Sequence, residues 1–176
     1  MPRVQDFRLR LAEAELADWA SLYPKESDAD AERIGMVVRA RGYLLQSELR
    51  GLARWKSPRI GSRIDRNGEG VVLEVTRMAL STSDTSLAIR SLQLLEGVGW
   101  PMASVILHFC APAKYPVLDV RALWTVGCDR LPPYSTTLWL RYTYFCRELA
   151  DRTGLSMRDV DRGLWQYSKD RGRSAG

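Results

Sequence analysis

The sequence predicts an all-α protein, and three observations lead to that prediction. Apolar residues recur three and four positions apart in nearly every segment, which places them on one face of a helix. Proline, glycine and short polar residues separate these segments at lengths typical of globular helices. The chain has 176 residues, of which 45% are hydrophobic and 27% are charged, as in one ordinary domain or two small lobes. We expect roughly eight to nine helices and no internal repeat.

The first third of the chain contains three amphipathic stretches. Each lies beside residues that start or stop a helix. The expected helices are residues 11–22 before Pro24, a second from Asp28 or Asp30 to about Arg41 before Gly42, and a third on the stripe Leu45, Leu49, Leu52 and Ala53 before Pro58.

One segment in the middle of the chain has two interpretations. Residues 71–75 have the composition of a strand, but they also belong to a stripe at helical spacing, and Asn67 stands where an N-cap would. We therefore prefer a helix, whose buried stripe would be Val71, Val75, Met78 and Ala79.

The remaining helices follow from their capping residues. A proline in the first turn costs nothing, because its missing N–H would be unpaired there anyway. The expected helices run from Ser83 or Asp84 through Leu95, from Pro101 to Phe109, from Asp119 as cap to Val126, from Ser135 to Arg152, and from a capping box at Ser156 to about Ser168, with a frayed tail over 170–176.

The content of histidine and cysteine excludes several kinds of chemistry. There is one histidine, His108, and the three cysteines lie 18 positions apart, so no CxxC pair exists. A cysteine zinc site, a four-thiolate iron–sulfur cluster and most metallohydrolase sites are therefore not expected. We expect no metal, and chemistry that depends mainly on carboxylate, Lys, Arg, Tyr or Ser side chains.

No segment has the roughly 18 consecutive apolar residues of a membrane-spanning helix. The first 15 residues carry charges throughout and have no apolar signal core. We expect a cytoplasmic, monomeric protein without a membrane partner.

The positive charge is concentrated in one stretch. The chain has 26 basic and 21 acidic residues, and residues 39–66 alone carry eight basic and two acidic ones, a local charge of +6. Such a stretch suits a polyanionic partner. The alternative is a solvated helical face whose acidic partners lie elsewhere in the fold.

Residues 87–109 form the most informative motif. An apolar helix is followed by Leu95-Glu96-Gly97-Val98-Gly99 and by a second helix that starts at Pro101. Glycines on both sides of Val98 allow a turn with positive φ, and the backbone N–H groups before a helix N-terminus can bind an anion. The alternative is an ordinary turn between two helices.

This segment resembles the helix-hairpin-helix motif of the base-excision DNA glycosylase superfamily, whose hairpin reads Leu-Pro-Gly-Val-Gly. The catalytic Asp of that superfamily follows the hairpin, and Asp119 stands at the matching distance. The nucleophilic Lys of its bifunctional members lies 18 residues before the Asp, where this chain has Pro101. The resemblance implies one glycosylase-like domain over 1–176, with two helical lobes flanking a groove that binds double-stranded DNA. It further implies hydrolysis of the N-glycosidic bond of a damaged or modified base, without strand cleavage through an imine.

The resemblance also assigns roles to individual residues. Asp119 would stabilise the oxocarbenium-like sugar and position water, unless it is only an N-cap. No cofactor is expected, and the one ion implied as an option is a monovalent cation bound by hairpin carbonyls. The residues expected at DNA are Gly97, Val98, Gly99, Trp100, Met102, Ala103, Lys56 and Arg59, and those expected around the extruded base are Trp55, Tyr115 and Arg121.

Several features depart from the superfamily pattern. Glu96 replaces the hairpin proline, Arg121 replaces a common His, and the iron–sulfur loop is absent. The alternative for Trp55 is a side chain packed on the core, and His108, on the apolar helix 102–109, is expected to be a core residue. Two other functions therefore stay open, a non-catalytic DNA-binding protein that retains the hairpin and a helical adaptor for protein partners. The sequence does not distinguish among uracil, alkylated purines and mispaired adenine as the base.

Overall fold

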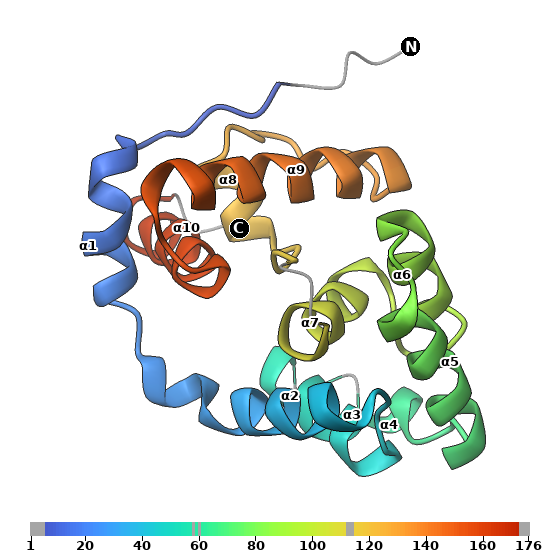
Figure 1. The fold of residues 1–176 in the computed structure, drawn as a ribbon. Coiled ribbons are helices and arrows are strands. Elements are labelled where there is room, and N and C mark those ends of the chain that lie inside the picture. The colour runs from blue at the N-terminus through green and yellow to red at the C-terminus, as the bar shows by residue number, and fades with distance from the viewer. Residues whose placement is uncertain (1–5, 58, 60, 112–114, 173–176) are drawn as a thin grey trace. The chain divides into compact units, whose positions relative to one another are not determined.

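A computed structural model describes residues 6–57, 59, 61–111 and 115–172, and over these residues the chain is helical, without strands (Figure 1). The chain forms two compact units: unit 1 comprises Met1–Pro24 and Pro116–Gly176, and unit 2 comprises Lys25–Tyr115. The helices of unit 1 are η1 (Glu13–Glu15), α1 (Leu16–Ser21), α8 (Val120–Thr125), α9 (Thr136–Thr153) and α10 (Met157–Arg171). Those of unit 2 are η2 (Lys25–Asp28), α2 (Ala29–Arg41), α3 (Gln46–Lys56), α4 (Gly61–Ile64), α5 (Glu69–Ser81), α6 (Thr85–Leu92) and α7 (Trp100–Cys110).

Helix α7 is the core of unit 2. It is the most apolar helix of this unit, and its residues 102–107 are all buried. Helices α2, α3 and α6 pack against α7, and α5 packs against α6. Because α7 follows directly after the glycine hairpin, this packing fixes one end of the hairpin.

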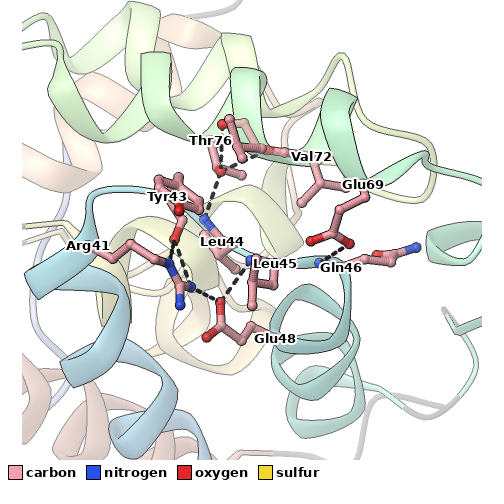
Figure 2. Close-up of polar contacts among 10 residues, drawn as sticks. Arg41, Tyr43, Leu44, Leu45, Gln46, Glu48, Glu69, Val72 and Thr76 are labelled. Carbon is pink, nitrogen blue, oxygen red and sulfur yellow. Dashed lines mark hydrogen bonds and ion pairs between the residues drawn. The ribbon is translucent and has the colours of Figure 1, made fainter.

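A polar network fixes the connection between α2 and α3 (Figure 2). The guanidinium of Arg41 donates to the carbonyl of Tyr43 and to the carboxylate of Glu48. The N–H of Leu44 donates to Thr76 Oγ1 at 2.9 Å, which joins this turn to α5. The first residue of α3, Gln46, is thereby placed at a defined position beside α4.

Unit 1 is built around α10, which packs against α1, α8 and α9. The N-terminal segment runs along the end of α8, because Arg8 N–H donates to Val126 O and Arg10 N–H donates to Thr125 O. Unit 1 therefore contains both the first and the last segment of the described chain.

Most capping residues are confirmed. Gly42 ends α2 with a φ of 90°. The side chains of Asp84, Asp119, Ser135 and Ser156 accept backbone N–H groups at the starts of their helices. These caps act within three or four residues, so the local sequence specifies them.

Several helix boundaries differ from the prediction. The first helix begins with a 3-10 turn at Glu13 instead of at residue 11, α6 ends at Leu92 instead of Leu95, and α10 continues to Arg171. The tail expected to fray is therefore helical at 170–171, and its residues 173–176 lie outside the described residues. Pro58 also lies outside them, and α3 ends at Lys56.

Helix α5 and the burial of Ala79 are confirmed, but the rest of its buried face and its cap were predicted wrongly. Val71 is 52% exposed and Met78 is 41% exposed. Its N-cap is Gly68, because the side chain of Asn67 is used elsewhere. The face that packs inward is shifted by one residue and consists of Val72, Thr76, Ala79 and Leu80.

Within the residues that the structure describes, no helix is both long and apolar enough to cross a membrane.

Candidate functional site

The glycine hairpin joins α6 to α7. The N–H of Val98 donates to Leu95 O at 3.1 Å, which closes the turn. Gly97 has a φ of 78°, a conformation that favours glycine. Gly99 does not share it, because it is the N-cap of α7 with a φ of −90° and a ψ of −173°. Of the two glycines that allow a turn with positive φ, only Gly97 therefore adopts one.

The short helix α4 packs directly on this hairpin. A Cβ on Gly97 would lie 3.0 Å from the Cβ of Arg63 and 3.1 Å from the backbone nitrogen of Ile64, which is fully buried. The segment that follows α4 is held as well. The side chain of Asn67 donates to Glu96 O at 2.9 Å and accepts from Glu96 N–H at 2.8 Å.

This packing creates a hollow of about 410 Å³, which we call the hairpin hollow. Two cations and the hairpin backbone surround it. Its lining residues are Arg59, Arg63, Leu95, Gly97, Val98 and Gly99.

The hairpin hollow combines backbone donors with positive charge. The N–H groups of Gly97 and Gly99, which line the hollow, have no hydrogen-bond acceptor among the described residues, and neither do those of Trp100 and Met102 in the first turn of α7. The guanidinium groups of Arg59 and Arg63 likewise have no ion pair or hydrogen bond to a described residue. Unpaired amides and guanidinium groups on one concave surface are the donors that bind phosphate oxygens.

Much of the basic stretch 39–66 is neutralised within unit 2. Arg39 donates to the carbonyl of Phe109, and Arg41 pairs with Glu48. Two further ion pairs join Arg50 to Asp65 at 2.6 Å and Arg66 to Glu96 at 3.6 Å. The local charge of +6 therefore overstates the charge that a ligand meets, and Arg59 and Arg63 are the members of this stretch at the hairpin hollow.

The other predicted DNA contacts on α7 are mostly buried. Met102 is 2% exposed and Ala103 is fully buried, so their side chains belong to the core. The Ala103 N–H donates to Gly99 O at 2.9 Å. Of these two residues, only Met102 therefore has a backbone N–H without an acceptor among the described residues. Trp100, the first residue of α7, is partly exposed. The side chain of Val98 is also buried.

Trp55 does not line the hairpin hollow. Its indole Nε1–H donates to the buried carboxylate of Asp28 at 3.2 Å, and its ring packs edge-on against Phe109. Its partly exposed side chain lines a second hollow of about 600 Å³ with Arg33 and Arg54, between α2 and α3. Lys56, the last residue of α3, is half-buried and lines neither hollow.

Tyr115 lies in the core of unit 2. Its side chain is 3% exposed, so it does not present an aromatic surface to a base in this structure. The carbonyl oxygen of Tyr115 lies 2.6 Å from Nδ1 of His108. This contact gives His108 a structural role, which is the alternative left open by the sequence.

Asp119 lies in unit 1, at the start of α8. Its Oδ1 accepts the N–H of Arg121 at 2.9 Å, and its side chain is partly exposed. The exposed guanidinium of Arg121 lies 5.6 Å from the ring centroid of Trp165. Burial raises the pKa of Tyr134, and the negative charge of Asp119 raises it further. Asp119 is therefore an N-cap, with a phenol close to its carboxylate.

Two residues were not predicted at this site: Arg63, which lines the hairpin hollow, and Asn67, which holds the backbone of Glu96. Arg63 follows Arg59 at a spacing of four, which was a usable signal for a shared surface. Asn67 is the only asparagine in the sequence. Its partner Glu96 lies 29 positions away, so no local pattern indicates their contact.

No cluster of three His, Cys, Asp or Glu side chains that could hold a metal occurs among the described residues. Of the hairpin carbonyls, those of Leu95, Glu96 and Gly99 already accept hydrogen bonds. Each of these carbonyls keeps a second lone pair, so the monovalent cation that the resemblance implies stays a prediction.

Comparisons with protein-family models, with curated proteins and with solved structures found no match to this chain.

Proposed function

We propose that this chain binds the phosphate backbone of double-stranded DNA at the hairpin hollow, and that it hydrolyses the N-glycosidic bond of a damaged or modified base. The observation that carries the DNA-binding part is the hollow itself. Arg59 and Arg63 line the same surface as Gly97, Val98 and Gly99. Two guanidinium groups and the unpaired N–H groups of Gly97 and Gly99 can donate to phosphate oxygens, and such contacts provide affinity without reading sequence.

The hydrolytic part depends on Asp119. Departure of the base leaves an oxocarbenium-like sugar, which a fixed carboxylate stabilises. The hydrogen bond from the Arg121 N–H holds one oxygen of this carboxylate in place, and the preceding residue Leu118 is fully buried. The resemblance to the glycosylase superfamily supplies the reaction class. Pro101 at the lyase position supports hydrolysis without a covalent imine.

The salt dependence of DNA binding tests the first part. The logarithm of the binding constant falls with the logarithm of salt in proportion to the number of phosphate contacts. Changing Arg59 and Arg63 together to Gln should reduce the magnitude of this slope by about two. The matched control changes Arg33 and Arg54 to Gln, since these line the second hollow and remove the same charge. Equal slopes for both double variants would contradict binding at the hairpin hollow.

A screen of oligonucleotides with damaged bases tests the second part. We expect abasic sites that become strand breaks only after hot alkali, and no adduct after borohydride. A protein that binds DNA but opens no abasic site in any substrate is a non-catalytic DNA-binding protein. A protein that does not bind DNA at all agrees with the adaptor alternative.

A further inference from the structure

Asn67 joins α4 to the hairpin through three hydrogen bonds. Its Nδ2 group donates to Ile64 O at 3.0 Å and to Glu96 O at 2.9 Å. The N–H of Glu96 donates back to Asn67 Oδ1 at 2.8 Å. An amide side chain that both donates to and accepts from one residue fixes the position and the orientation of that backbone.

We infer that Asn67 is the positioning residue of the hairpin hollow, which aims the N–H of Gly97 at the bound phosphate and keeps the hairpin in register with Arg63. This inference rests on the proposed binding of phosphate at that hollow.

The geometry of the peptide bond explains how Asn67 acts. The carbonyl of Glu96 and the N–H of Gly97 belong to one planar trans peptide, so they point in opposite directions. Because Asn67 holds the carbonyl of Glu96, the N–H of Gly97 points away from Asn67. Gly97 lines the hairpin hollow, and its N–H has no acceptor among the described residues.

The position of Asn67 is itself supported from α3 and α5. The Nε2 group of Gln46 donates to Ile64 O at 2.9 Å and to Asn67 O at 3.2 Å. The backbone N–H of Gln46 donates to the carboxylate of Glu69 on α5 at 3.1 Å (Figure 2). A continuous set of contacts therefore runs from α5 through Gln46 and Asn67 to the hairpin, and Asn67, at 9% exposed, is buried within it.

The test uses the full-length protein and three variants. Asn67→Asp keeps the acceptor for Glu96 N–H but loses the donor to the carbonyls of Ile64 and Glu96. Asn67→Ala loses the donor and the acceptor without adding charge. Gln93→Glu makes the same amide-to-carboxylate change close to the hairpin, where the amide makes only a local bond to Ile89 O at 3.2 Å. Inorganic phosphate is titrated by 15N NMR, and affinity for a labelled DNA duplex is measured separately.

Wild-type protein and Gln93→Glu should both show a phosphate-dependent shift of the Gly97 amide. The two Asn67 variants should lose that shift and at least about tenfold in DNA affinity, whereas the amides of the middle of α7 keep their positions. The NMR signal is the decisive readout, because a residue that only stabilised the fold would not change the response of one amide selectively.

A measurement on wild-type protein covers the case of a variant that does not fold. Because the sequence contains one asparagine, selective labelling gives the signal of a single side-chain amide nitrogen with its two protons. This signal should shift with the same midpoint as the Gly97 amide. An unchanged Asn67 signal, or Asn67 variants that bind like wild type, overturns the inference and leaves the proposed function intact. Wild-type protein that binds neither phosphate nor DNA overturns the proposed function itself.

Discussion

Gly97 and Arg63 approach each other so closely that a Cβ on Gly97 would lie 3.0 Å from the Cβ of Arg63. The hairpin and α4 therefore meet through the bare backbone of Gly97, which also has a φ of 78°. Gly99 contrasts with Gly97 in both respects. Its backbone is extended, and a Cβ there would meet only Pro101 Cδ, at 4.0 Å.

The two glycines should therefore respond differently to alanine. Gly97→Ala should lower the free energy of unfolding by roughly 1–3 kcal/mol, because it places a side chain in the left-handed region and against α4. Gly99→Ala should change stability by less than about 1 kcal/mol, because the smaller freedom of the unfolded chain is offset by the poorer N-cap that alanine makes, while its methyl group at the hairpin hollow weakens DNA binding. Urea unfolding and DNA titration measure the two effects. Similar losses of stability in both variants would show that this hairpin geometry is wrong.

Glu96 is expected to oppose DNA binding. Its carboxylate lies 3.6 Å from Arg66, both side chains are exposed, and the pair contributes little to stability. Glu96→Gln should raise DNA affinity roughly 2–10-fold at low salt, with a smaller gain at higher salt, because it removes a negative charge and releases Arg66. The contact with Asn67 should persist, since it uses the backbone of Glu96.

The control for this prediction is Glu74→Gln on α5. Glu74 forms an exposed pair with Arg77 at 3.4 Å and does not line the hairpin hollow. An equal gain in affinity from Glu74→Gln would assign the effect to net charge instead of to the hairpin.

Asp119→Asn separates capping from chemistry. Asparagine is as good an N-cap as aspartate, so the free energy of unfolding should change by at most about 1 kcal/mol. Base excision should fall at least about 100-fold, because the charge that stabilises the transition state is lost. The pKa of Tyr134 should also fall toward its ordinary value, since the negative charge of Asp119 helps to raise it. Asp151, an exposed residue of α9, provides the control as Asp151→Asn. If Asp119→Asn excises at the wild-type rate, Asp119 is only a cap.

Asp84 should make the helix before the hairpin sensitive to acid. Its carboxylate accepts the Ser86 hydroxyl and the Leu87 N–H, and these bonds lower its pKa below 3.8. The ionised cap therefore contributes fully above about pH 3.8, and its contribution is lost as the pH falls through the folded-state pKa. Asp84→Asn has a neutral cap without this dependence. The stability difference between wild type and Asp84→Asn should be constant near neutral pH and change only below about pH 3.8, as urea unfolding at several pH values can measure.

The sequence predicted features that depend on neighbours, and missed features that depend on distant partners. The caps at Gly42, Asp84 and Ser156 were identified because their partners lie within one helical turn. The local sequence around Asn67 is equally typical of an N-cap, yet its side-chain amide donates to the carbonyl of Glu96. The adjacent valines at 71 and 72 leave the face of α5 ambiguous by one position, and only packing selects Val72.

The candidate site was predicted in part for the same reason. Gly97 and Asp119 were found from local motifs, whereas the meeting of Arg63 with the hairpin depends on tertiary packing. Trp55 was assigned to a base pocket because no local signal shows that its indole is bonded to Asp28, 27 positions away.

The arrangement of unit 1 from two separate chain segments has a consequence for the order of folding. Unit 2 is one continuous segment, so its contacts can form as soon as that segment has left the ribosome. Unit 1 requires contacts such as that between Tyr167 Oη and Arg10 O, which lie 157 positions apart. Closing so long a loop costs more entropy, and the contact cannot form before α10 has been synthesised. During synthesis the glycine hairpin should therefore reach its native form while α8, which Asp119 caps, still lacks its partner α10.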